Sequence, residues 1–180
     1  MLKSRRKNAE EVKKLLLTVF LPALLGLSIP AFAQQSRSPM KPLSLVLAEF
    51  KNERDLAKIS YFLMRCSGFS YAMAGLITKS GGIAGKATAD NWSDNGATSV
   101  QLAFEVEKTI EKIRDIKINR ESTQSFASIV KAVSEIANVY VDRMNNNYVR
   151  SGNYVVDDLW LKEEMEFCRN STKIVEQLLE

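Results

Sequence analysis

Two cysteines and the complete lack of histidine set the chemistry that this 180-residue chain can carry out. Without histidine, the chain has no Ser–His or Cys–His nucleophilic pair and lacks the usual ligands of zinc, copper and haem. A helical bundle that holds haem or a di-iron centre also needs histidine on facing helices. We therefore expect no bound metal and no cofactor.

The two cysteines, Cys66 and Cys168, are expected to form a disulfide bond. Both follow a predicted export signal, and exported chains with two cysteines usually join them. Each also lies 11 residues into a predicted helix, on its apolar stripe, if those helices start at Asp55 and Asp157. The bond would close a long loop, which the chain-entropy model values at about 4.7 kcal/mol. Two buried thiols or a redox-active pair are the alternatives, although redox pairs are typically C-x-x-C.

Paired carboxylates are the remaining route to catalysis, because two acids that flank a bond are enough for glycoside hydrolysis. Every candidate lies on an expected exposed face or at an expected helix start, where solvated charge or helix capping explains it. We therefore favour a protein that is not an enzyme and keep a carboxylate-pair hydrolase as an alternative. The candidates are Glu105, Glu107, Glu111, Asp157, Asp158, Glu163, Glu164 and Glu166.

Residues 1–33 have the organisation of a secretory signal peptide. A basic segment precedes an apolar run over residues 15–29, and Ala31-Phe32-Ala33 supplies the small-x-small cleavage pattern, which leaves Gln34 as the first mature residue. The apolar run is shorter than the ~20 residues of a spanning helix. We expect a periplasmic or secreted protein with no stable membrane span in the mature chain. An uncleaved signal anchor is the alternative.

Cleavage changes what the net charge of +4 means. Six of the 25 Lys and Arg residues and two of the 21 Asp and Glu residues lie in the leader, which leaves 19 of each sign. The basic excess therefore belongs to the targeting segment, and we expect no nucleic-acid partner. The remaining 147 residues are enough for a single domain with a buried core.

The mature chain is predicted to be all-α. Residues 34–42 form a polar arm with two prolines, and residues 43–180 form a helical domain, because their apolar side chains recur every three or four positions. The short link between the second and third segments favours antiparallel neighbours and an up-down-up-down four-helix bundle. The four predicted helices run from residue 43 or 55 to 79, over 99–119, over 122–148 and over 157–179.

Small side chains over residues 67–75 predict that another helix approaches the first predicted helix closely. Gly68 and Gly75 each cost about 1 kcal/mol of helix propensity relative to Ala, and close packing would compensate. Aromatic residues in the predicted stripes fit a packed core. As an alternative function, they could instead line a cavity that carries a small apolar ligand.

Residues 80–98 are predicted to form a long loop rich in Gly, Ala, Asn and Asp. Gly85-Lys86 lacks the upstream Gly and the following Ser or Thr of a phosphate-binding loop. Trp92 has little reason to serve folding in such a loop, and an exposed Trp is typical of binding hot spots. We therefore favour an exported, non-enzymatic module that binds a protein or envelope partner. Its candidate binding residues are Lys86, Asp90, Trp92 and Asp94.

Overall fold

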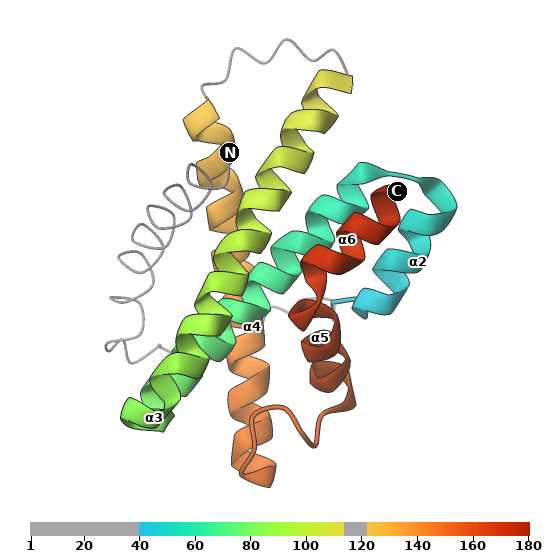
Figure 1. Ribbon diagram of the computed structural model, residues 1–180. Helices are drawn as coiled ribbons and strands as arrows, with labels where there is room; N and C mark the ends of the chain where they lie inside the picture. Colours follow the sequence, from blue (N-terminus) through green and yellow to red (C-terminus); the bar gives the residue numbers. More distant parts are fainter. Residues whose placement is uncertain (1–39, 114–121) are drawn as a thin grey trace, which may run out of the picture. The chain divides into compact units, whose positions relative to one another are not determined.

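The computed structural model describes residues 40–113 and 122–180, and all its regular elements in these ranges are α-helices (Figure 1). The chain divides into two units, Met1–Lys41 and Pro42–Glu180. The predicted signal peptide, most of the predicted arm and residues 114–119 of the predicted second helix lie outside the described residues. Within the described ranges, no helix combines the length and the apolar character that a membrane crossing requires.

The first described helix, α2 (Leu43–Glu53), is short and separate from the next one. It starts after Pro42 and buries one apolar face. Arg54 ends it in the left-handed conformation, with φ 54° and ψ 27°. The side chain of Asp55 then accepts a hydrogen bond from the Ala57 amide (3.0 Å) at the start of α3. Of the two predicted starts of the first long helix, the one at Asp55 is therefore correct.

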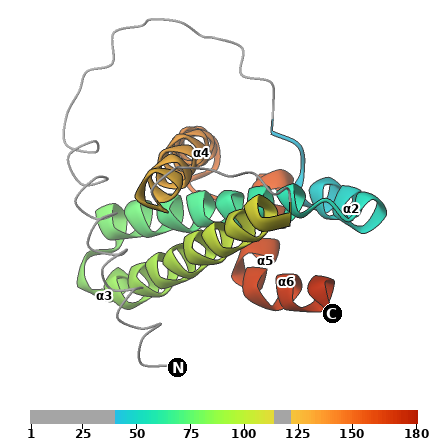
Figure 2. The ribbon, with the colours of Figure 1, turned by 90° about the horizontal axis from the view of Figure 1, so that it is seen from above.

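Helix α3 (Leu56–Ile113) folds back on itself to give two arms that lie side by side (Figures 1 and 2). The Ser67 hydroxyl donates to the Gly96 carbonyl at 2.9 Å, although 29 residues of straight helix would separate them by about 44 Å. Near the reversal, a Cβ placed on Gly85 would lie 3.1 Å from the Ile77 side chain. The element is therefore a helical hairpin.

The predicted loop over residues 80–98 is wrong, because these residues belong to α3. Their small side chains indicate a loop by composition, but they let the two arms pack closely. A Cβ on Gly96 would lie 3.1 Å from the Tyr71 ring, and Ala89 and Ala97 are buried. Thr98 and Ser99, where the second predicted helix starts, are interior to α3, and the Thr98 hydroxyl donates to the Asp94 carbonyl (2.9 Å).

Helix α4 (Ser122–Ser151) agrees with the third predicted segment and packs against α3. The two helices approach each other closely at Gly68, where an added Cβ would lie 2.6 Å from Ile136 Cγ2 and 3.0 Å from the Ala137 nitrogen. This contact confirms the predicted close approach of a second helix to the small-residue segment. Gly152, with φ 73°, follows the end of α4.

The fourth predicted helix is two helices, α5 (Leu159–Arg169) and α6 (Ser171–Leu179), with a break at Asn170. Asp158 caps α5, and its carboxylate accepts hydrogen bonds from the Trp160 and Leu161 amides. Both helices contact α3, and α5 also contacts α2. These contacts place α5 beside the centre of the first α3 arm, where the two cysteines meet.

Candidate functional site

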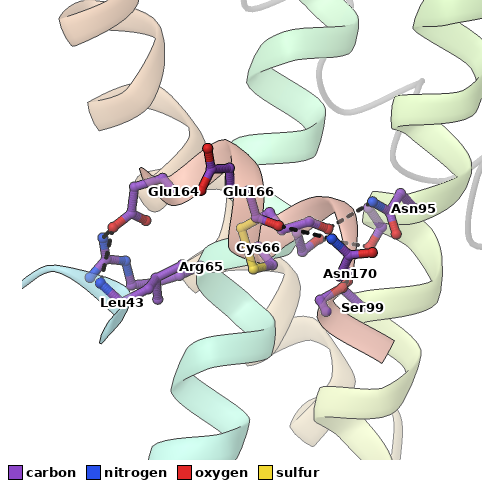
Figure 3. The surroundings of a disulfide bond; sticks show 12 residues. Leu43, Arg65, Cys66, Asn95, Ser99, Glu164, Glu166 and Asn170 are labelled. Carbon is purple, nitrogen blue, oxygen red and sulfur yellow. Dashed lines mark hydrogen bonds and ion pairs between the residues drawn. A yellow bond between two sulfur atoms is a disulfide. The ribbon is translucent and has the colours of Figure 1, made fainter. Parts of the chain in front are cut away.

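Cys66 of α3 and Cys168 of α5 form a disulfide bond, as predicted (Figure 3). Their Cα atoms are 4.7 Å apart, and both side chains are fully buried. Each cysteine lies on the apolar stripe of its helix, and this position brings the two sulfurs together.

A buried ion pair joins the same two helices next to the disulfide (Figure 3). Arg65 Nη2 lies 2.7 Å from Glu164 Oε1, and the exposed fraction of both side chains is 0%. Arg65 directly precedes Cys66, and Glu164 is one helical turn before Cys168. The disulfide bond and the neighbouring ion pair therefore both join α3 to α5.

Tyr140 of α4 and the start of α2 complete this network. Arg65 Nε and Nη2 both donate to Tyr140 Oη at 3.1 Å, and Tyr140 Oη donates to Glu164 Oε2. The Leu43 amide at the first turn of α2 donates to Glu164 Oε1 at 3.2 Å. The carboxylate of α5 thus accepts hydrogen bonds from α2, α3 and α4.

Aromatic rings surround the charged groups of the network. The Arg65 guanidinium lies 5.4 Å from the centroid of the Trp160 ring, and Trp160 stacks on Tyr140 with centroids 5.5 Å apart. Arg143 lies 4.3 Å over the same Trp160 ring and pairs with Asp158 through two hydrogen bonds of 2.7 and 2.9 Å. Because guanidinium groups are attracted to aromatic faces, these rings stabilise Arg65 in its buried position.

Burial controls the protonation of the network. Desolvation raises the pKa of Tyr140 well above its usual value, and the neighbouring Glu164 charge adds to this effect. Desolvation also raises the pKa of Glu164 and outweighs the lowering by Arg65 and by the hydrogen bond from Tyr140. Asp158 differs, because its hydrogen bonds from Arg143 and the Leu161 amide outweigh its partial burial and lower its pKa.

The second arm of α3 reaches the other side of the disulfide (Figure 3). Asn95 Nδ2 donates to the Cys168 carbonyl at 2.9 Å, and the Ser99 and Ser171 hydroxyls are hydrogen-bonded at 3.2 Å. Asn95 thus satisfies a carbonyl at the C-terminal end of α5, where intrahelical partners run out. Polar side chains from both arms of α3 therefore fix the α5–α6 pair.

Glu164 corrects one sequence expectation, because it is neither exposed nor at a helix start. Both of its oxygens accept hydrogen bonds, and no part of its side chain contacts solvent. Glu164 therefore links helices inside the domain. Asp158 caps α5. The remaining acids lie at exposed or half-buried positions, namely Glu105, Glu107, Glu111, Asp157, Glu163 and Glu166.

Three of the four candidate binding residues lie together on one exposed helix face. Lys86, Asp90 and Asp94 are spaced by four residues in the second arm of α3, and all three are exposed. Trp92 is on the opposite side and only 7% exposed. Its ring packs edge-on against Phe69 at 5.7 Å, so Trp92 serves the packing of the hairpin and is not an exposed binding residue.

Known proteins offer no assignment for this arrangement. Among the described residues, no group of three or more acidic, cysteine or histidine side chains is placed to hold a metal ion. No family model, no curated protein and no solved structure matches the chain.

Proposed function

We propose that this protein is an exported, non-enzymatic helical module that binds a protein or cell-envelope partner. Its contact surface is the exposed face of residues 80–98, centred on Lys86, Asp90 and Asp94. The observation that carries the proposal is the gathering of these three side chains on one face of the second α3 arm. The Cys66–Cys168 disulfide is compatible with an oxidising compartment outside the cytoplasm.

The hairpin gives this face a fixed shape before any partner binds. On the opposite side of the same arm, Trp92 packs against Phe69 and the Gly96 carbonyl accepts the Ser67 hydroxyl. A face that is already ordered loses less entropy on binding than a flexible loop does. Lys86, Asp90 and Asp94 carry a net negative charge together, so the partner should present basic groups with an acid opposite Lys86.

Site-specific photo-crosslinking in intact cells tests this surface. We expect a crosslinker at Asp90 to give a defined adduct with an envelope protein. The matched control is Glu135, an exposed acid on α4, where the same crosslinker should give no such adduct. The charge reversals Lys86→Glu and Asp94→Lys should remove the adduct at Asp90. An adduct at Glu135 but not at Asp90 would contradict the proposed surface.

The proposal includes export with cleavage after Ala33 and a mature four-helix bundle. In that interpretation, the two arms of α3, α4 and the α5–α6 pair are the four rods. Intact-mass analysis of protein isolated from the periplasm tests the export step, and we expect a chain that begins at Gln34. A full-length mass for protein recovered from the membrane fraction would favour the uncleaved anchor.

A further inference from the structure

Docking of the α5–α6 pair buries polar and charged side chains together with apolar ones. Only five of its residues are buried, and two of these, Leu161 and Val175, are aliphatic. The other three are Glu164, Cys168 and Ser171. The remaining apolar side chains of both helices are half-buried or exposed. Buried apolar area is the main driving force for docking, and the burial of the Glu164 charge opposes it.

The buried ion pair adds little to this attachment. Two charges must leave water before Arg65 and Glu164 can meet, and that desolvation roughly cancels their attraction. Hydrogen bonds from Tyr140 and from the Leu43 amide satisfy the carboxylate only after α5 has docked. Docking of α5 therefore needs a further favourable free energy. The Cys66–Cys168 bond can supply it, because it joins the same two helices next to the ion pair.

We propose that the Cys66–Cys168 disulfide is a folding switch that decides whether α5 and α6 dock and whether the Arg65–Glu164 charges become buried. In the reduced chain, α5 and α6 stay undocked and Glu164 stays in water. A dithiol–disulfide oxidant then takes two electrons from the two thiols, each thiol loses its proton, and one S–S bond forms. In the oxidised chain, α5 and α6 dock and the Arg65–Glu164 ion pair becomes buried.

The biological role of this disulfide switch rests on the proposed export of the protein. A chain that crosses the membrane unfolded must not complete its fold in the reducing cytoplasm. Because the switch needs oxidation, the final docking step occurs only in the compartment where the protein would work. The switch itself is a property of the folded chain, so it can be tested in the purified protein whether or not export is correct.

Amide hydrogen exchange on the purified protein, with the disulfide intact and after reduction, tests the switch. The two cysteines are 102 residues apart in the sequence. For a loop of this length, the chain-entropy model predicts that the disulfide changes the equilibrium constant for docking of α5 and α6 by a factor on the order of a thousand. We expect exchange in α5 and α6 and at the Leu43 amide to accelerate by about that factor on reduction. Cys66→Ala/Cys168→Ala should reproduce this result without reductant.

A neutral background provides the matched control. In Arg65→Met/Glu164→Gln no charge is buried, while the glutamine oxygen still accepts from the Leu43 amide. We expect α5 of this variant, once reduced, to exchange at least about tenfold more slowly than α5 of the reduced unsubstituted protein, because its docking buries no charge. Equal exchange rates in α5 of the two reduced proteins would show that charge burial does not set the requirement. If the unsubstituted protein exchanges alike in α5 before and after reduction, the switch is wrong, whatever the variant does.

Discussion

Arg65 and Glu164 illustrate how a charged residue can lie on an apolar stripe. Arg65 is three residues after Phe62 and four before Phe69, and Glu164 is three after Leu161 and four before Cys168. This spacing was the available signal that both face the core. By residue type, Glu164 is predicted to lie on an exposed face or at a helix start, and Arg65 is not a candidate site residue. Residue type outweighed position, because charged residues are almost never fully buried unless they are paired.

The first prediction concerns this pair. Arg65→Met should destabilise the oxidised protein by about 3–5 kcal/mol, because it leaves Glu164 buried without its cation. Arg65→Met/Glu164→Gln should recover most of that loss, since no charge is then buried. Urea unfolding of the oxidised proteins measures both values. Equal losses in the single and double variants would mean that desolvation of Glu164 is not the dominant cost.

Gly68 gives a second prediction at the residue scale. A Gly→Ala change inside a helix usually stabilises by about 1 kcal/mol, but here the new methyl would lie 2.6 Å from Ile136 Cγ2. Because the Ala137 backbone is also close, we expect Gly68→Ala to destabilise by about 1–3 kcal/mol. The control is Gly68→Ala in an Ile136→Ala background, where the added methyl has room and the loss should shrink. Thermal unfolding distinguishes the two cases.

At the scale of elements, sequence periodicity identified the helical segments but not how they are interrupted or joined. The predicted segment 122–148 is close to α4 because its apolar stripe is continuous. For residues 80–98, composition predicts a loop because Gly, Asn and Asp have low helix propensity. Contacts such as Gly96 with Tyr71 outweigh that propensity, and a single sequence does not reveal them. The apolar periodicity also does not reveal the left-handed Arg54 or the break at Asn170.

The start of α5 supports a prediction with an adjacent control. Asp158 accepts from the Trp160 and Leu161 amides and pairs with Arg143, whereas Asp157 is exposed. Asp158→Ala should cost about 1–2 kcal/mol through the lost cap alone, and more through the lost pair. Asp157→Ala should change stability by less than about 0.5 kcal/mol. Chemical denaturation compares the two, and similar losses would show that the cap is not the cause.

At the scale of the whole domain, α3 is the common partner of the other described helices. Helices α2, α4, α5 and α6 all contact it. Phe69, in its first arm, packs edge-on against both Trp92 and Tyr140, with centroids 5.7 and 5.2 Å apart. The core therefore connects the hairpin that carries the proposed contact face with the network that holds α5. A change at Tyr140 should consequently be visible in the unfolding of the whole domain.

Tyr140 sets a pH limit on that unfolding. Its pKa lies well above 10.0 in the folded protein, so the unfolded chain ionises first as the pH rises. The stability that Tyr140 contributes is thus fully present below about pH 10 and is lost as the pH increases above it, with a limiting slope of about 1.4 kcal/mol per pH unit. Burial and the nearby Asp94 charge also raise the pKa of Tyr71, so part of the alkaline slope should remain in Tyr140→Phe.

We expect the urea midpoint of Tyr140→Phe to fall less steeply between pH 9 and pH 11 than that of the unsubstituted protein. Tyr148→Phe, which alters a ring that is 47% exposed, should leave the slope unchanged. Parallel slopes in all three proteins would mean that the Tyr140 hydroxyl is not protonated more strongly in the folded state than in the unfolded one.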